Sequence, residues 1–367
     1  AYRIAIEDLR RLKAHTLSPE MEGLLAASQE MGSAVAKSYS LLADADFENP
    51  MVADESGELV KVSTGRFVPM LESQDVRVRK EAFQAYYARY EQYKNTFASL
   101  YEGKAKANFF YAKARKYGSS MEAAVDANNV PKEVYYNLIE AVHENMHYMH
   151  DYVALRKKLM GVEELHMYDV YVPIVGEMKE KITYAQAQEE IAAALAVLGE
   201  GYVSVLKEGF GNRWIDKYEN EGKRSGAYSA GCYSAHPYVL MNFQYNLDSE
   251  FTLAHEMGHA LHSYYSAKHN NIFDSEYKIF LAEVASTCNE ALLMDYLLKH
   301  TEDKEKKAHL INYFLQQFRS TLYRQAMFAE FELLTHQMVE NGEALTAESL
   351  KKLYYELNVQ YYGDAVV

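Results

Sequence analysis

The spacing of apolar side chains predicts a mainly helical chain. Apolar residues recur at helical intervals with few breakers, and we expect two helices within the longest of these stretches, 75–116. A proline at the favoured first position predicts another helix from Pro131 to about Met160, which Gly161 ends. Thr183 is a plausible cap for an alanine-rich helix. The remaining ranges with helical spacing are 19–44, 184–198, 276–299, 304–340 and 347–358.

Strands are expected in only a few places. Apolar and polar residues alternate over 51–63 around a Ser56-Gly57 turn, which predicts a β-hairpin. The ranges 226–231 and 237–242 are typical of short strands, and 166–175 also looks extended. We therefore expect a mainly α fold with a small β-sheet. The expected domains are a helical lobe over 1–200, which includes the hairpin, and a second lobe over 201–367, with an approximate boundary.

Composition indicates an ordinary globular protein and argues against several kinds of partner. Hydrophobic residues make up 49% of the chain and charged residues 25%. The net charge of -14 repels phosphate backbones, so nucleic acid is not expected as a partner. No apolar run is long enough to span a membrane. The only cysteines, Cys232 and Cys288, form no disulfide framework, which is typical of the reducing cytoplasm.

The stretch 254-AHEMGHALHSYY-265 carries the strongest chemical signal. On a helix, His255 and His259 share one face, so their imidazoles can converge on one metal ion. Glu256 lies beside the first histidine, where it can take a proton from a metal-bound water. Asp248 or Ser249 can cap this helix. Because the motif arises by chance in roughly a few per cent of such chains, the surrounding sequence must support it.

A catalytic zinc ion needs a third protein ligand. A metzincin would place a histidine where Tyr265 stands, and the nearby His262 and His269 are more typical of solvated or capping residues. A carboxylate from the range 276–298 is the remaining option. Helical spacing does not choose among the candidates, which fall seven residues apart and are Glu276, Glu283 and Glu290. The small and apolar neighbours of Glu283 suggest that this carboxylate needs a partner such as zinc.

Five sequence blocks together resemble one protein family. The chain is similar to the oligoendopeptidase F branch of the M3 (thimet oligopeptidase-like) zinc metallopeptidases. The resemblance extends over nearly the whole chain, and its five blocks follow one another in the order of the family. The blocks are 223-KRSGAYS-229, 236-HPYVLMNFQ-244, 252-TLAHEMGHALH-262, 282-AEVASTCNE-290 and 324-RQAMFAEFE-332.

The resemblance implies a site and a fold. It implies one zinc ion held by the two histidines and by Glu283, which opens a Glu-x-x-Ser pattern with Ser286. It implies that Glu290 orients a zinc ligand without binding the zinc itself, although Glu290 is equally compatible with an ordinary surface residue. Strand addition of substrate is expected at the stretch Gly226, Ala227 and Tyr228. His236 either faces the cleft or fixes the turn before Pro237. The implied fold is bilobed and mostly helical, with the small sheet beside the active-site helix and a deep substrate channel.

The resemblance also implies an activity. We expect a cytoplasmic zinc endopeptidase that hydrolyses short unfolded peptides, with Glu256 as the general base on a zinc-bound water. The alternative is a non-catalytic peptide-binding or scaffold protein that keeps the fold but has no need of Glu256.

Family members carry a further N-terminal helical region and a C-terminal segment rich in His and Tyr that stabilises the oxyanion. We therefore expect an interior piece without either flank. The cleavage preference and the oligomeric state are left open.

Overall fold

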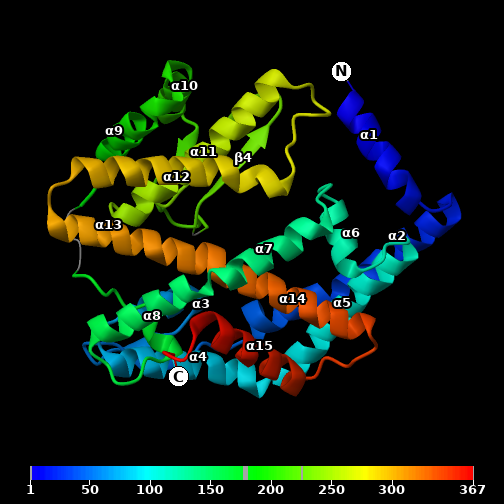
Figure 1. Cartoon of the computed structure of the whole chain (residues 1–367), viewed down its shortest axis with the longest axis horizontal. Coiled ribbons are helices and arrows are strands. Elements are labelled where there is room, and N and C mark those ends of the chain that lie inside the picture. The colour runs from blue at the N-terminus through cyan, green and yellow to red at the C-terminus, as the bar shows by residue number, and fades with distance from the viewer. Residues whose placement is uncertain (1, 177–180, 225, 367) are drawn as a thin grey trace. The chain divides into compact units, whose positions relative to one another are not determined.

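The computed structural model describes residues 2–176, 181–224 and 226–366, and these are mainly helical, as the apolar spacing predicts (Figure 1). The chain forms two compact units, each assembled from separate stretches. Unit 1 comprises Ala1–Lys13 and Gly176–Phe314, and unit 2 comprises Ala14–Val175 and Leu315–Val367. These units differ from the ranges 1–200 and 201–367, which stay a prediction about domains.

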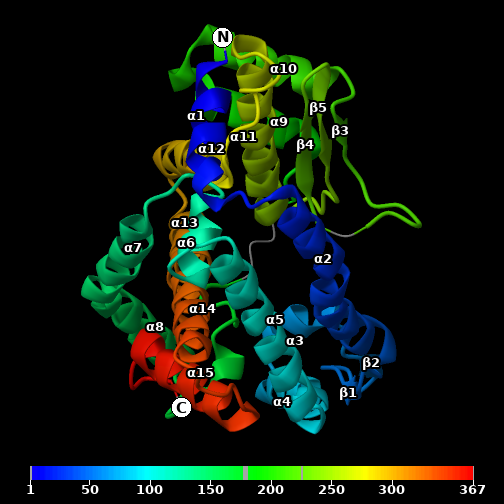
Figure 2. The ribbon, with the colours of Figure 1, turned by 90° about the vertical axis from the view of Figure 1, so that its right-hand side faces the viewer.

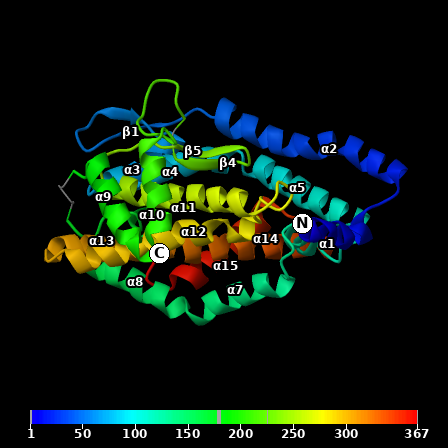
Figure 3. The same cartoon turned by 90° about the horizontal axis from the view of Figure 1, so that it is seen from above.

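Unit 1 is built around packed helices and one small sheet. Its largest core cluster joins buried side chains from five helices, through Ile191, Leu206, Leu253, Leu293 and Leu310 among others. Two of these helices, α11 and α12, lie side by side (Figure 3). The helices of this unit are α1 (Arg3–Leu12), α9 (Tyr184–Ala194), α10 (Glu200–Gly211), α11 (Leu247–His269), α12 (Ile279–His300) and most of α13 (Lys304–Gln317), with a 3-10 turn at Leu195–Leu198.

The sheet of unit 1 has three strands in the order β3-β5-β4 (Figure 2). The strands are β3 (Ile215–Asp216), β4 (Tyr228–Cys232) and β5 (Ala235–Leu240). β4 pairs antiparallel with β5 and occupies one edge of the sheet. The two predicted strands are confirmed with shifts of one or two residues, whereas the short β3 was not predicted. β4 also runs close against α11, since a Cβ on Gly231 would lie 2.9 Å from the Ser263 Cβ.

Unit 2 is helical apart from the predicted hairpin, which is confirmed as β1 (Met51–Ala53) paired with β2 (Leu59–Lys61). The predicted pair of helices within 75–116 is also confirmed. The helices are α2 (Pro19–Ser40), α3 (Thr64–Leu71), α4 (Val76–Gln92), α5 (Lys94–Ala114), α6 (Ser120–Asp126), α7 (Lys132–Glu144), α8 (Met146–Met160), α14 (Arg324–Glu340) and α15 (Ala347–Tyr362). π-helical turns at Leu41–Asp46 and Phe318–Tyr323 extend α2 and precede α14.

The expectation of a single helix from Pro131 to Met160 is wrong. The helix breaks at Asn145, where φ is -104°, and α7 and α8 lie on either side. The Asn145 carbonyl accepts a hydrogen bond of 2.8 Å from the Tyr323 hydroxyl. A tertiary contact thus uses a backbone group at the break, and periodicity alone does not reveal such a contact. Gly161 does end α8, in the left-handed conformation (φ 66°).

The expectation of an extended segment at 166–175 is also wrong, because the chain makes a 3-10 turn at Met167–Asp169. The Asp169 carboxylate organises this turn, since it accepts a 3.0 Å hydrogen bond from the His166 backbone N–H. The same carboxylate forms a buried ion pair with Arg79, with an Nη2–Oδ1 distance of 2.7 Å. The contacts of the buried Asp169 carboxylate therefore decide the turn conformation of this segment.

Two further sequence expectations concern membranes and cysteines. Among the described residues, no helix combines the length and the apolar character needed to cross a bilayer. Cys232 and Cys288 are both free and exposed, so neither forms a disulfide bond in the fold.

Candidate metal centre

Helix α11 presents the two histidines opposite a buried face. Leu253, Ala260 and Leu261 are fully buried, as the sequence predicts, and they direct the other side of the helix outward. The expected caps are wrong. Asn246 caps the helix instead, with its side chain accepting a 2.9 Å hydrogen bond from the Ser249 backbone N–H.

Helix α12 supplies the carboxylates. It begins at Ile279, so Glu276 lies outside the helix, and the expected stripe of three glutamates is wrong on this point. Glu283 and Glu290 remain on α12, two turns apart, and both reach the histidines of α11. Glu276 is exposed and is not part of the cluster.

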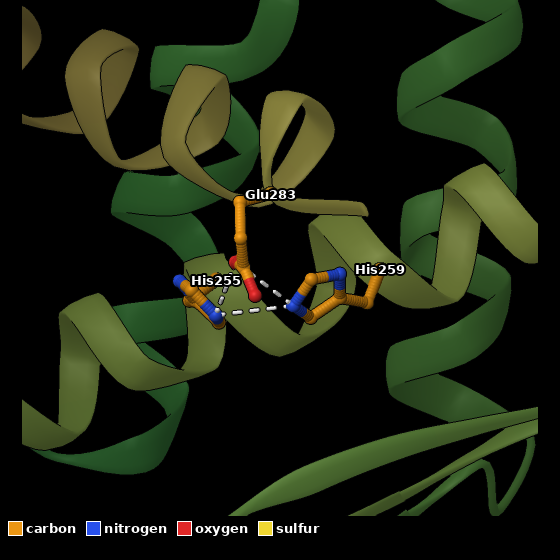
Figure 4. Close-up of side chains that lie close together, drawn as sticks. All are labelled: His255, His259 and Glu283. Atoms are coloured by element: carbon orange, nitrogen blue, oxygen red, sulfur yellow. Dashed lines mark hydrogen bonds and ion pairs between the residues drawn. The ribbon is translucent and has the colours of Figure 1, made fainter. Parts of the chain in front are cut away.

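The structure brings His255, His259 and Glu283 together (Figure 4). The two Nε2 atoms lie 3.1 Å apart, and each lies 3.3 Å from Oε2 of Glu283. A tetrahedral zinc ion with bonds of about 2.0–2.1 Å holds its ligand atoms about 3.3–3.4 Å apart. The three donor atoms therefore have the spacing of one face of such a tetrahedron, and two imidazoles with one carboxylate are a donor set that zinc accepts.

Solvent reaches the third donor, contrary to the expectation from its neighbours. The Glu283 side chain is 63% exposed, and the neighbouring Val284 is exposed as well. A hydrogen bond from Ser286 holds the carboxylate in place, with an Oγ–Oε2 distance of 2.6 Å. Ser286 itself is fully buried. The Glu-x-x-Ser pattern therefore pairs an exposed carboxylate with a fixed hydroxyl one turn later.

Gly258 explains how α12 comes close enough to deliver its carboxylates. A Cβ at this position would lie 2.6 Å from the Cα of Ser286 and 2.8 Å from the carbonyl oxygen of Ala285. No side chain larger than hydrogen fits between the two backbones here. The motif thus contains, between its histidines, the residue that lets the next helix approach.

His255 is held from both sides of its ring. Oε1 of Glu290 lies 2.5 Å from Nδ1, while Nε2 faces Glu283. A carboxylate on Nδ1 fixes the tautomer that leaves Nε2 free to bind a metal. Burial alone would lower the pKa of His255, but the surrounding carboxylates, first among them the hydrogen-bonded Glu290, together outweigh burial and raise the pKa. Burial lowers the pKa of His259.

Glu256 is buried beside the cluster. The residue is 6% exposed, and its Oε2 atom has no hydrogen-bond partner. Burial raises the pKa of this carboxyl group, although the charge of His255 acts in the opposite direction. A buried carboxylate oxygen without a partner normally costs free energy, so this atom is available to a ligand.

The expected substrate stretch leads into the edge strand. Tyr228 is the first residue of β4 and is 55% exposed, whereas Gly226 and Ala227 precede the strand. Gly226 adopts φ +87°, which favours glycine, and its carbonyl accepts a 2.9 Å hydrogen bond from Asn242. Ser225, within the first sequence block, lies outside the described residues.

The three other histidines considered from the sequence stack on aromatic rings. His236 stacks on Trp214 with ring centroids 5.3 Å apart, and its Nδ1 lies 2.8 Å from the Pro237 carbonyl oxygen. His262 stacks on Tyr277 at 3.7 Å. His269 also stacks on a tyrosine, and neither of the last two joins the metal cluster. Sequence reasoning missed the role of Gly258 and the burial of Asn289, although both residues stand inside the quoted blocks.

Comparisons with known proteins show which family the chain resembles. Residues 69–367 match Peptidase family M3, and residues 1–48 match Oligopeptidase F. The chain is similar to oligopeptidase PepF of Bacillus subtilis (strain 168), with 46% identity over 366 residues that cover 100% of this chain and 55% of that protein. It is 41% identical over 364 residues to an oligoendopeptidase F homolog of Lactococcus lactis subsp. lactis (strain IL1403), covering 99% and 60% of the two chains.

A solved structure shows the same fold. The crystal structure of oligoendopeptidase-F from Enterococcus faecium superposes with a TM-score of 0.80 at 37% identity, covering 100% of this chain and 59% of that one. The chain thus spans little more than half the length of these relatives. The match to the family covers most of the chain. The chain therefore belongs to peptidase family M3.

Proposed function

We propose that this chain carries the metal site of a zinc-dependent endopeptidase that hydrolyses short oligopeptides. His255, His259 and Glu283 would hold one zinc ion. The observation that carries this proposal is the triangle of donor atoms, with sides of 3.1, 3.3 and 3.3 Å. Three protein ligands leave a fourth position open, which is the pattern of catalytic rather than structural zinc.

Glu256 is the proposed general base. Bound zinc supplies Lewis-acid chemistry, since it polarises a carbonyl oxygen and lowers the pKa of a water to about 7. The Glu256 carboxylate accepts the proton of the attacking water and returns it to the leaving amine. Its buried Oε2 atom, which has no hydrogen-bond partner, supports this role.

The edge strand β4 is the proposed binding surface for the substrate main chain. One side of β4 pairs with β5, and β4 ends the sheet on its other side. An extended peptide that adds to such an edge is held by main-chain hydrogen bonds, so its side chains are little selected. This mode suits an enzyme for oligopeptides of varied sequence. Gly226, Ala227 and Tyr228 would form the start of this surface.

A peptide-binding protein without activity is the second candidate. It would need the edge strand but not Glu256, which no other described group engages through Oε2. The retention of a buried carboxylate beside two intact ligands therefore favours the enzyme. Short unfolded peptides are the proposed partners, and the cytoplasmic location stays a prediction.

The test is the substitution Glu256→Gln, with Glu276→Gln as the matched control because Glu276 is exposed and outside the cluster. We expect the wild-type chain and both variants to bind one zinc ion. Cleavage of a quenched fluorescent peptide should fall about 10²- to 10⁴-fold in Glu256→Gln only. Full cleavage by Glu256→Gln would exclude the proposed base. The assay uses the protein with the flanking regions that the family carries, and there an inactive wild type with intact zinc would favour the binding protein.

A further inference from the structure

Asn289 is a buried polar residue at the contact between the two metal-binding helices. It lies on α12, directly before Glu290, and is 1% exposed. Its Nδ2 donates a 3.0 Å hydrogen bond to the carbonyl oxygen of Ala254, the residue before His255 on α11. A buried amide without partners would cost free energy, so this side chain is stable only where α11 offers that carbonyl.

A second helix contact completes the arrangement. The Tyr202 hydroxyl, on α10, donates a 2.9 Å hydrogen bond to Oδ1 of Asn289. Burial raises the pKa of Tyr202 to about 12, so its hydroxyl keeps its proton and remains a donor. The amide thus uses both its oxygen and an N–H group. Three helices are connected through one side chain, called here the Asn289 relay (Tyr202, Asn289 and the Ala254 carbonyl).

The relay lies one helical turn from the close contact at Gly258. On α11 the two contact points are residues 254 and 258, and on α12 they are 289 and 285–286. Increasing number on one helix corresponds to decreasing number on the other, so the two contacts fix one antiparallel register. In this register Glu283 reaches His259 and Glu290 reaches His255. A shift by one turn would separate both pairs by about 5.4 Å.

The close approach at Gly258 does not by itself define the register. Most of the other buried residues of these two helices are apolar, and apolar contacts are non-directional. A single buried polar group can instead select one arrangement, as a buried asparagine does in coiled coils. The geometry points to Asn289 as a positioning residue that sets α12 on α11 and thereby aligns the carboxylates with the histidines. This inference rests on the proposed zinc site.

The experiment measures zinc affinity and cobalt spectra in relay variants. Asn289→Leu removes both hydrogen bonds at similar volume, and Asn289→Asp keeps the acceptor for Tyr202 but loses the donor to Ala254. We expect zinc affinity, measured by competition with a chromophoric chelator, to fall about 10- to 100-fold in both. The visible absorption bands of the cobalt(II)-substituted protein should also change, because they report ligand geometry.

A matched control separates positioning from general stability. Thr335→Val, in unit 2, removes a fully buried hydroxyl that lies 2.8 Å from the Tyr101 hydroxyl. It should lower the melting temperature but leave zinc affinity and the cobalt spectrum unchanged. Tyr202→Phe keeps the ring and loses one hydrogen bond, so it should weaken zinc binding severalfold even if the Asn289 variants do not fold.

The outcomes distinguish the inference from the function. If Asn289→Leu binds zinc within twofold of the wild type with an unchanged cobalt spectrum, Asn289 is not a positioning residue. The same holds if the leucine variant does not fold and Tyr202→Phe matches the wild type. If the wild type itself binds no zinc, or binds it equally well after His255→Ala, the proposed function fails instead.

Discussion

Oε1 of Glu290 lies 2.5 Å from Nδ1 of His255, on the side of the ring away from Glu283. The two glutamates of α12 therefore have different geometry despite their equal spacing in sequence. Oε2 of Glu283 lies 3.3 Å from both Nε2 atoms, whereas Glu290 contacts the other nitrogen of the His255 ring and would act on a bound metal only through that ring.

This difference predicts the order of effects on zinc binding. Glu283→Ala should release the metal because it removes a donor atom. Glu290→Ala should retain stoichiometric zinc with an affinity about 10- to 100-fold lower. Glu276→Ala should behave as the wild type, since Glu276 lies outside α12 and the cluster. Metal content after dialysis measures all three, and zinc loss from Glu276→Ala alone would contradict the ligand assignment.

Gly258→Ala should disturb both stability and metal binding. The added methyl group would lie 2.6 Å from the Ser286 Cα, so the helices must move apart. Overpacking of this kind typically costs about 1–3 kcal/mol in the free energy of unfolding. Zinc affinity should fall with it, since α12 carries Glu283. Gly201→Ala, where a Cβ meets nothing within 4 Å, is the control in calorimetry and chelator competition. Wild-type zinc affinity in Gly258→Ala would show that the helix separation does not matter.

The ion pair between Arg79 and Asp169 should be essential to unit 2. The two side chains are 4% and 2% exposed, so Asp169→Asn leaves a buried guanidinium without its counter-charge. We expect the free energy of unfolding to fall by about 3–5 kcal/mol. The exposed pair of Lys299 and Asp295 provides the contrast, and Asp295→Asn should change it by less than about 1 kcal/mol. Denaturant titration of both variants decides, and equal effects would be inconsistent with this view.

Removal of the metal should destabilise the protein measurably. A ligand that binds only the folded state adds about 2.7 kcal/mol when its concentration is a hundred times its dissociation constant. A strong chelator should therefore lower the melting temperature of the wild type. His259→Ala should melt at the chelated value with or without zinc. A melting temperature that does not respond to zinc in the wild type would count against the site.

Main-chain pairing at β4 predicts how modified substrates behave. An N-methyl group on a substrate amide that pairs with the strand removes a hydrogen-bond donor and adds bulk. We expect a scan of single N-methylations along a peptide to reveal alternate positions at which KM rises about tenfold or more. Conservative side-chain changes at the same positions should have smaller effects. A scan without any sensitive position would argue against strand addition.

Much of the fold was predictable because helical periodicity is strong. The helices over 19–40 and 347–362 follow their apolar spacing, and Thr183 caps α9 as expected. The errors arise where a tertiary contact decides the local conformation. The break at Asn145 exposes a carbonyl that receives Tyr323, and the turn before Val170 follows the buried carboxylate of Asp169. Such partners lie far away in sequence, so a local pattern does not report them.

The site was predictable only in part from spacing. The four-residue interval predicted the pairing of His255 with His259, but an interval of seven left three glutamates equivalent. The family resemblance selected Glu283, and the structure places it beside both rings. The argument from apolar neighbours failed in its premise, because Glu283 is mostly exposed. The register of α12 on α11 depends on Gly258 and Asn289, whose roles appear only when the two helices are seen together.

The interleaved assembly of unit 1 limits where the polypeptide can be shortened. Ile182, Ala187 and Ile191 are buried in the same cluster as α11 and α12, yet they precede residue 201. A protein expressed from residue 201 onward would keep every proposed metal ligand but would lose these buried side chains from the core that packs α11 and α12. A shortened chain that keeps the proposed ligands therefore need not fold. A minimal fragment for metal binding should begin before Ile182.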